Sequence, residues 1–412
     1  MFRNYLLTAW KVFMRRKLFT AINLLCIVLT LVVLMVVTAL LQNTFYPTGV
    51  EGKSDRMVQM VMMRSSHTDK PGMRNGTLGY KIIDQYLKPM PGVEAVSASY
   101  FPQSVAVYQD GRVSDVQLRR TDAEYWRILD FRVVSGRVIN ADDVEQGRFV
   151  AVLNLSTARK LFPGQPYLNQ KFLVDGQTFT VIGVVEDALQ VNAYADAWAP
   201  ITTFPSTDYK NQEFGGFMAM ILARKAADLP AVKRDILRIA KTVQYNDPTR
   251  YNVAQFWGDS KLELFARTMT NSTADDAGAP KFVASIVALM LLFMALPALN
   301  LINLNVGRIM ERSSEIGVRK AFGATGRQLV AQLVLENVLL CLIGGAIGLA
   351  CAAGALWWLE ASGLIPYLKV ELNLAVFGYG LLLTLAFGVL SGVIPAWKMS
   401  RLDPVRALKG NA

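Results

Sequence analysis

Four long apolar stretches dominate the chain. They cover residues 18–41, 282–307, 329–357 and 372–397, and only the third contains a charged residue, Glu336. Each is at least as long as the ~20 residues that an α-helix needs to cross a hydrocarbon core of about 30 Å. Because a backbone inside lipid must satisfy its own hydrogen bonds, the pattern predicts four transmembrane helices.

The first stretch could instead be a secretory signal, since basic residues precede it. Its uncharged run exceeds the ~7–15 apolar residues of a signal-peptide core, and no A-x-A-like cleavage site follows, so we expect a retained anchor. Upstream, apolar residues recur every three or four positions opposite basic ones. This predicts an amphipathic helix over 1–17 at the membrane surface, with Phe2, Tyr5, Leu6, Ala9, Trp10 and Phe13 on its apolar face.

The segment between the first two stretches, residues 42–281, has a different pattern. Short β-rich runs alternate with runs of helical periodicity, which is typical of a mixed α/β domain. The pair Asp175-Gly176 between two β-rich runs predicts a tight hairpin turn. The fold class is therefore a membrane protein with four transmembrane α-helices and a large mixed α/β extracytoplasmic domain inserted between helices 1 and 2. Within that domain the runs predict strands at 56–63, 93–99, 149–153, 171–174, 178–185 and 218–223, and helices at 78–86, 154–161 and 229–242.

The basic residues indicate how the helices are oriented. Of all residues 52% are hydrophobic and 18% are charged, and the net charge is +11. Residues 1–17, 308–328 and 398–412 together hold 14 basic and 3 acidic residues, which accounts for the whole excess. Lys and Arg are retained on the cytoplasmic side during insertion, so both termini and the middle loop are expected inside. Residues 42–281 then lie outside, and 358–371 form a short outer loop.

This distribution also decides between two kinds of partner. A basic excess spread over a soluble surface would suggest nucleic acid. Here the excess flanks the apolar stretches, so we interpret it as an insertion signal and an attraction to the lipid membrane, and we expect no nucleic acid. Cys26, Cys341 and Cys351 all lie in apolar stretches, so no disulfide framework is expected in the outer domain.

Catalytic constellations are scarce in the sequence. The single histidine, His67, lies in a polar Ser-Ser-His-Thr-Asp loop, so neither a Ser-His-Asp triad nor a histidine metal site is expected. The nearest imitation of a nucleotide-binding G-x-x-x-x-G-K-[ST] loop has Pro47 in place of its first glycine. We therefore expect a chain that is not an enzyme and binds no cofactor or metal. Any ATP-driven work must be powered by another subunit.

The segment after the second stretch carries the most informative pattern. It reads Glu311-Arg-Ser-Ser-Glu-Ile-Gly-Val-Arg-Lys-Ala-Phe-Gly-Ala-Thr325. Glu315 and Arg319 are four residues apart in the acid-first order that stabilises a helix, and Thr325 is placed to cap the helix that follows. From these residues alone, a solvated charged helix and an interaction site are equally good interpretations.

With Gln332, Glu336 and Gly344-Gly-Ala-Ile-Gly348, this segment closely resembles the signature of FtsX/MacB-like ABC-transporter permeases. Other segments resemble the family in the same order along the chain. Residues 9–17 resemble its basic pre-helix, and 394–409 resemble its exit from the last span. Three outer segments resemble a MacB-like periplasmic core domain, namely Ser135-Gly-Arg137, 158–162 and 179–187, whereas Pro166-Tyr-Leu-Asn169 departs from the family's Asn-Pro-Ile-Gly.

The resemblance implies a multi-pass permease of the bacterial inner membrane, with both termini cytoplasmic and the large domain periplasmic. In this family the charged helix docks on a partner ATPase. ATP and Mg are then expected on a cytoplasmic ABC ATPase subunit, and a fused N-terminal ATPase is not expected, because only 17 residues precede the first span. The implied docking residues are Glu311, Arg312, Glu315, Ile316, Arg319, Lys320 and Phe322.

The implied mechanism is mechanotransmission, in which closure of the ATPases is carried to the outer domain, which moves a drug, peptide or lipoprotein. The expected partners are a second permease copy or a sister permease, and a periplasmic adaptor or lipoprotein chaperone. Two alternatives use the same membrane frame. A division-type regulator of a cell-wall hydrolase would be expected to have a smaller outer domain, and a lipoprotein-release permease would differ only in what the outer domain binds.

Polar and small residues inside the predicted spans are further candidates. Glu336 is expected near the inner interface in a structural or interface role. Asn300 and Asn303 need partners in a neighbouring helix. Small residues that permit close helix contact, either within one subunit or at a dimer interface, are Gly344, Gly348 and Ala352.

Overall fold

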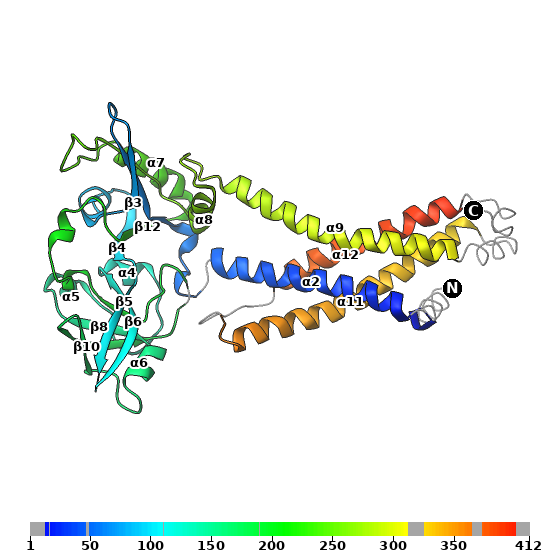
Figure 1. Cartoon of the computed structure of the whole chain (residues 1–412), viewed down its shortest axis with the longest axis horizontal. Helices are drawn as coiled ribbons and strands as arrows, with labels where there is room; N and C mark the ends of the chain where they lie inside the picture. The colour runs from blue at the N-terminus through cyan, green and yellow to red at the C-terminus, as the bar shows by residue number, and fades with distance from the viewer. Residues whose placement is uncertain are drawn as a thin grey trace. The chain divides into compact units, whose positions relative to one another are not determined.

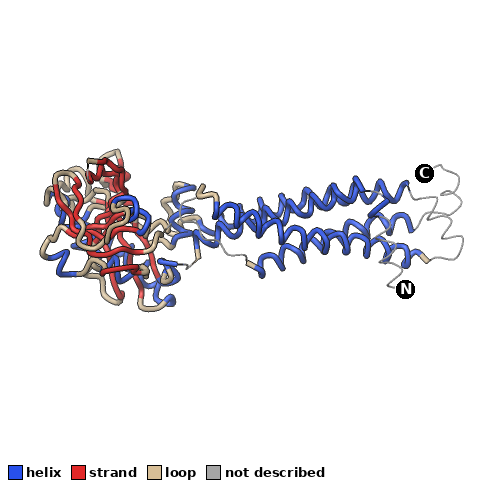
Figure 2. The backbone as a smooth tube through the Cα atoms, turned by 90° about the horizontal axis from the view of Figure 1, so that it is seen from below, coloured by secondary structure: helices blue, strands red, loops and turns tan. Residues whose placement is uncertain are grey.

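The chain folds into two compact units (Figure 1). Residues Met1–Gln42 and Pro280–Ala412 form what we call the helical unit, and Asn43–Ala279 form the α/β unit. Figure 2 shows the strands gathered in the α/β unit and the long helices side by side in the helical unit. The structure, a computed structural model, describes residues 13–15, 17–46, 49–109, 111–188, 190–311, 325–364 and 373–400.

Each predicted apolar stretch corresponds to one long helix, although the last, 372–397, starts before its helix begins at Leu374. These helices are α2 (Lys17–Phe45), α9 (Ala279–Glu311), α11 (Gly326–Ala361) and α12 (Leu374–Ser400). Within the described residues, α2 and α11 contain runs long and apolar enough to cross a membrane, whereas the apolar runs of α9 and α12 are shorter. The long runs are Thr20–Phe45 and Val330–Ala361, and the shorter ones are Ala279–Ala295 and Leu374–Leu390.

Helix α11 begins at the cap that the sequence predicts. The Thr325 side chain accepts a hydrogen bond from the backbone N of Gln328 at 3.4 Å, and the Gln328 side chain accepts one from the backbone N of Thr325 at 3.0 Å. This reciprocal pair satisfies two donors that a helix N-terminus otherwise leaves open. The predicted role of Thr325 is therefore confirmed.

A ten-stranded sheet forms the body of the α/β unit, in the order β1-β12-β4-β6-β11-β8-β10-β9-β5, with β7 on β10. Because β5 also pairs with β6, the strands from β6 through β11, β8, β10 and β9 to β5 close on themselves as a small barrel. Strands β4, β12 and β1 continue from β6 as an open wing. The bounds are β1 (Met57–Met60), β4 (Val93–Tyr100), β5 (Gln103–Gln109), β6 (Arg112–Thr121), β7 (Val133–Gly136), β8 (Val150–Asn154), β9 (Lys171–Val174), β10 (Gln177–Val185), β11 (Ala197–Pro200) and β12 (Phe217–Ala223).

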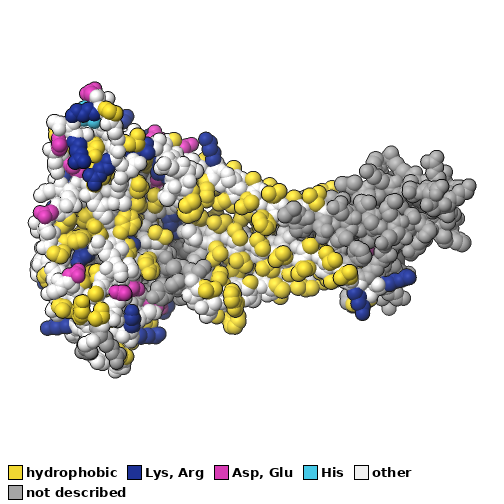
Figure 3. All heavy atoms as spheres, viewed as in Figure 1, with side chains coloured by type: hydrophobic (Ala, Val, Ile, Leu, Met, Phe, Trp, Pro, Cys, Tyr) yellow, Lys and Arg dark blue, Asp and Glu magenta, His cyan; other side chains and the backbone are white. Residues whose placement is uncertain are grey.

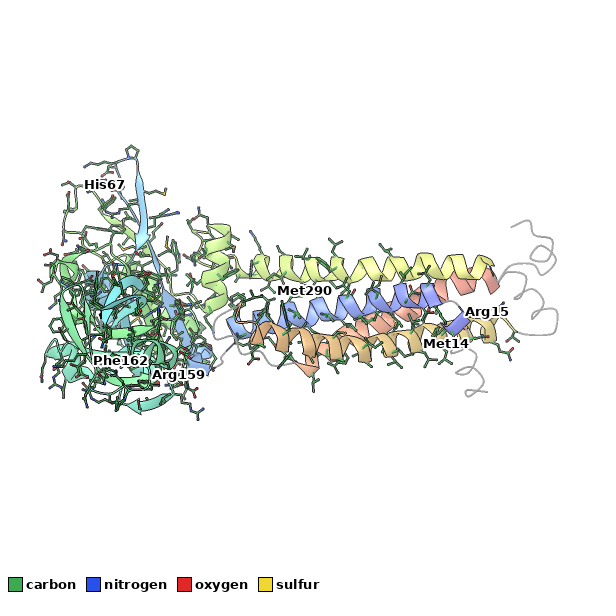
Figure 4. All side chains as sticks on the ribbon, turned by 60° about the horizontal axis from the view of Figure 1, so that its bottom comes forward. Met14, Arg15, His67, Arg159, Phe162 and Met290 are labelled. Carbon is green, nitrogen blue, oxygen red and sulfur yellow. The ribbon has the colours of Figure 1, made fainter. Side chains whose placement is uncertain are left out.

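A smaller antiparallel sheet has the order β13-β2-β3. It consists of β2 (Met62–Ser66), β3 (Met73–Thr77) and β13 (Val253–Phe256). His67 lies at the far end of the β2–β3 hairpin (Figure 4), where its Nδ1 accepts a hydrogen bond from the backbone N of Asp69 at 3.0 Å. The histidine is thus part of a local loop, as its sequence context predicts.

Apolar side chains fill the barrel and both faces of the wing. Val116, Leu153 and Phe179 lie in the barrel interior with Leu161 of α6, and Val58, Ile221 and Ile236 lie between the wing and α7. On the other face of the wing, Met218 and Met220 of β12 cluster with Trp198 of β11. The helices that cover these cores are α3 (Tyr80–Ile82), η3 (Ile83–Leu87), α4 (Glu124–Ile128), α5 (Ala141–Glu145), α6 (Leu155–Leu161), α7 (Leu229–Ala240) and α8 (Lys261–Thr270).

Two of the three segments that resemble the periplasmic core domain, 135–137 and 179–187, meet where β7 pairs with β10. Gly136 is in register with Gly183, and a Cβ at Gly183 would lie 2.0 Å from the Arg137 carbonyl oxygen. Arg137 also donates two hydrogen bonds, at 2.5 and 2.9 Å, to the buried carboxylate of Asp143. Burial raises the pKa of Asp143, but the hydrogen bonds from Arg137 and from the backbone of Asn140 outweigh it and hold this pKa below its ordinary value. The segments around Gly136 and Gly183 therefore pack directly against each other.

Several predicted elements occur with small changes. The predicted strand 171–174 is β9, and the hairpin turn after it has positive φ at Asp175 (49°) and Gly176 (78°), as a type I′ turn requires. The predicted strand 56–63 is wrong in one respect, because the chain passes at Val61 from the large sheet to the small one. The predicted helix 78–86 is the short α3 followed by a π-helical turn, η3.

Replacing Gly183 with Ala should destabilise the α/β unit, because the new methyl group would overlap the Arg137 carbonyl oxygen. Overpacking of this kind costs about 1–3 kcal/mol. Thermal unfolding of the purified chain in detergent should show the loss. Gly52→Ala is the matched control, since its nearest neighbours would be 3.6 Å away in ordinary contact. Equal unfolding of wild type and Gly183→Ala would contradict the assigned contact.

Candidate functional site

The small residues of α11 lie against α2 of the same chain. A Cβ at Gly344 would be 2.7 Å from Ile27 Cγ2, and one at Gly348 would be 3.3 Å from Leu31 Cβ. Ala352, one turn further along α11, is fully buried. The sequence leaves open whether this face packs within one subunit or at a dimer interface. In this structure Gly344 and Gly348 are covered by α2.

Helix α12 packs equally closely against α11 and α2. A Cβ at Gly345 would be 2.6 Å from Leu381, one at Gly388 would be 2.7 Å from Cys341 Sγ, and one at Gly380 would be 2.7 Å from Leu34. A glycine therefore stands at a close contact between each pair of these three helices. The resulting core contains the buried side chains Ile27, Leu31, Leu340 and Cys341.

A few polar side chains are buried in this core. Glu336 is 3% exposed and accepts a hydrogen bond from Gln332 Nε2 at 3.3 Å, and Asn337 donates one to the carbonyl oxygen of Gly388 at 3.2 Å. Glu336 thus lies within the helical unit beside Gln332 and not on its surface. The Thr384 hydroxyl donates a hydrogen bond to the carbonyl oxygen of Gly380, in its own helix, at 2.8 Å. Asn23 is 1% exposed, and its amide makes no hydrogen bond within the described residues.

Asn23 and Asn337 are buried polar residues that the sequence analysis did not single out. Both are amides inside apolar stretches, and an amide in lipid costs free energy unless it is bonded. The same rule that predicts partners for Asn300 and Asn303 also applies to Asn23 and Asn337. Asn300 and Asn303 lie in α9 as expected, and the structure does not describe their side chains.

The predicted docking segment begins at the end of α9. Glu311 is the last residue of that helix. The other predicted docking residues lie outside the described residues, so their role stays a prediction; they are Arg312, Glu315, Ile316, Arg319, Lys320 and Phe322.

An apolar groove of about 470 Å³ lies between α2 and α9. Leu29, Leu289 and Phe293 on its walls are each more than half exposed, and Met290 faces it from α9 (Figure 4). Figure 3 shows apolar side chains spread over the viewed face of the helical unit. The full lining is Cys26, Leu29, Thr30, Val33, Leu34, Val37, Leu289, Met290, Phe293 and Met294. Among the described residues no group of three or more His, Cys, Asp or Glu could hold a metal ion.

Comparison with known families agrees with this architecture. Residues 20–239 match the family model of the MacB-like periplasmic core domain, and residues 287–404 match that of the FtsX-like permease C-terminal domain. The chain belongs to this family. It is an ABC-transporter permease of the MacB/FtsX type, a membrane protein with a periplasmic domain.

Two relatives illustrate the similarity. The uncharacterized ABC transporter permease YknZ of Bacillus subtilis is 25% identical over 329 residues, which are 78% of this chain and 77% of the relative. The macrolide export ATP-binding/permease protein MacB 1 of Yersinia pestis is 25% identical over 416 residues, which are 99% of this chain and 60% of the relative. This chain thus spans less than two thirds of that MacB relative.

Solved structures include the periplasmic region of MacB from Actinobacillus actinomycetemcomitans. It is 15% identical, with a TM-score of 0.41, and the match covers 55% of this chain and 98% of that one.

Enlarging Gly344 should separate α11 from α2. In Gly344→Leu the added side chain would overlap Ile27, and overpacking costs about 1–3 kcal/mol. The melting temperature of the chain in detergent should fall by several degrees. Gly354→Leu is the matched control, because it lies on the same helix with nothing within 4 Å of its Cβ position. If both variants melt alike, Gly344 does not set the distance between these helices.

Proposed function

We propose that this chain is the permease subunit of an ABC transporter of the mechanotransmission type, with α2, α9, α11 and α12 as its four transmembrane helices. A partner ATPase binds ATP and Mg on the cytoplasmic side. This chain binds no cofactor itself and carries the movement of the ATPase to the periplasmic α/β unit, which then moves a periplasmic or membrane cargo.

The packing of α2, α11 and α12 is the observation that carries this proposal. A path for a polar solute needs a cavity lined by polar groups. Here the three helices touch at Gly344, Gly380 and Gly388, and the large groove beside α2 has an apolar lining. Such packing supports a role in transmitting displacement, because closely packed interiors transmit strain.

The cargo is a drug, a peptide or a lipoprotein. The name of the Yersinia relative refers to macrolide export, which favours export of a drug. A lipoprotein-release permease and a regulator of a cell-wall hydrolase are the alternatives. Partners that co-purify with the chain in gentle detergent separate the three, since a periplasmic adaptor, a lipoprotein chaperone and a wall hydrolase would each be identified by mass spectrometry.

A second permease copy, or a sister permease, completes the proposed transporter. The small face of α11 is covered by α2, so it offers no open surface for that copy. The groove between α2 and α9 is open and apolar, and Leu29, Leu289 and Phe293 project from it. We therefore place the contact between copies at this groove.

Reversing charge in the predicted docking segment should weaken binding of the ATPase. Glu315→Lys and Arg319→Glu should each reduce the amount of cytoplasmic ATPase that co-purifies, because each reverses one charge on the helix proposed to meet it. The purified chain alone should hydrolyse no ATP. Lys171→Glu, on an exposed strand residue of the periplasmic unit, is the control and should leave recovery unchanged. If as much ATPase co-purifies with both docking variants as with wild type, the docking role of this segment is contradicted.

Cysteine crosslinking tests the contact between copies. In a chain whose three cysteines are replaced by Ala, Phe293→Cys should give a disulfide-linked dimer when membranes are oxidised. Leu382→Cys is the control, since Leu382 is similarly exposed but lies on α12 outside the groove. A dimer formed through Leu382→Cys and not through Phe293→Cys would move the contact to another face.

A further inference from the structure

Helix α8 contacts both chain segments that connect the α/β unit with the helical unit. At its start, Lys261 Nζ donates a hydrogen bond to the carbonyl oxygen of Tyr46, just after α2, at 3.2 Å. Near its end, Arg267 donates to the carbonyl oxygens of Ser272 and Ala274, just before α9, at 3.1 and 2.7 Å. In the middle, Phe265 packs edge-on against Phe45 with ring centroids 5.5 Å apart. One short helix therefore holds both connections.

Glu51 ties the first connection to the barrel. One carboxylate oxygen accepts a hydrogen bond from Lys261 Nζ at 2.7 Å, and the other accepts one from the backbone N of Asn192 at 3.1 Å. The carbonyl oxygen of Asn192 in turn accepts hydrogen bonds from Arg119 on β6, at 3.0 Å, and from the Tyr125 hydroxyl, at 2.8 Å. Lys261 and strand β6 are thus joined through a continuous chain of hydrogen bonds.

A second ion pair ties the other connection to the wing. Arg267 donates to both carboxylate oxygens of Asp259, at 2.6 and 2.9 Å, and its guanidinium lies 4.3 Å from the centre of the Trp257 ring. Asp259 exchanges two backbone hydrogen bonds with Gln59 on β1, at 2.8 and 3.0 Å. The segment before α9 is therefore held to the edge of the large sheet.

These two pairs differ from the other ion pairs of the α/β unit. Glu51 and Lys261 have side chains 1% and 9% exposed, and Asp259 and Arg267 are each 6% exposed. In every other ion pair that the described residues of this unit form, at least one partner is more than 10% exposed. A buried ion pair adds little net stability, because desolvation offsets the attraction, but breaking one leaves an uncompensated buried charge. Its main effect is to fix one geometry.

We propose that Glu51 and Lys261 form a junction that makes the ends of α2 and α9 move together with the periplasmic barrel. The two are positioning residues that act through α8, Asn192 and Arg119. The inference rests on the proposed function, because it names the contact by which a movement of the membrane helices reaches the α/β unit. Without the ion pair, the segment after α2 would be free to move while the sheet stays still.

Hydrogen exchange of the complex with its co-purifying ATPase tests the junction. In wild type, trapping the ATPase with ATP and vanadate should change deuterium uptake in residues 93–223 of the barrel and wing. In Glu51→Gln and in Lys261→Met this change should fall several-fold, while ATP hydrolysis and recovery of the complex stay as in wild type. Lys261→Arg keeps the charge and should restore the change.

Lys81→Met is the matched control for stability. It breaks the Lys81–Glu213 pair, whose side chains are 12% and 15% exposed and which lies away from both connections. It should lower the melting temperature and leave the nucleotide-dependent change intact. If Lys261→Met does not fold, Glu51→Gln carries the test, since a neutral amide oxygen can still accept from Asn192.

The outcomes separate the junction from the function on which it rests. A wild-type complex that shows no nucleotide-dependent change overturns both. A change that persists unaltered in Glu51→Gln and Lys261→Met overturns the junction and leaves the proposed function standing. Loss of the change in Lys81→Met as well would reduce the effect to general stability and would also overturn the junction.

Discussion

Close helix contact at glycine is the constraint on which the helical unit depends. Lipid gives two helices little hydrophobic reason to associate, so they are held by van der Waals packing and a few hydrogen bonds. Packing of this kind needs the backbones to approach closely, and glycine alone permits a distance at which a Cβ would overlap Ile27, Leu34 or Leu381. The buried amide of Asn337 is bonded to the backbone of α12 at one of these close approaches, beside Gly388. Helices α2, α11 and α12 thereby behave as one packed body.

The α/β unit is held together by different forces. Backbone pairing closes its barrel and joins the wing to it, and apolar side chains buried from water stabilise both. Several buried charged side chains then fix one segment of this unit against another. Arg137 holds the turn at β7 on Asp143, and Lys261 and Arg267 hold the two connections. In each case the charged side chain bonds to another segment of the chain and fixes its position.

Much of this architecture is legible in the sequence because it depends on local pattern. Apolar length predicts the four helices, composition predicts a mixed α/β unit, and the turn at Asp175-Gly176 follows from the φ angles that only a few residues adopt. The sequence pattern does not predict strand β6, because its two buried arginines, Arg119 and Arg120, interrupt the apolar alternation. Barrel closure is not predicted either, since it depends on β5 pairing with β9, and no local pattern encodes that long-range register.

The junction shows why the candidate site is harder to predict than the fold. Glu51 and Lys261 are 210 residues apart, and each looks like an ordinary charged residue in its own segment. The pair differs from a surface ion pair because it is buried. That burial follows only from the folded arrangement of α8, the segment after α2 and the loop at Asn192. The helix contacts at glycine are easier to predict than this ion pair. Small residues spaced four apart on an apolar helix indicate a close helix contact even when the partner helix is not known. A close helix contact can therefore be predicted from the sequence of one helix, whereas a buried ion pair can be predicted only when both partner segments are known.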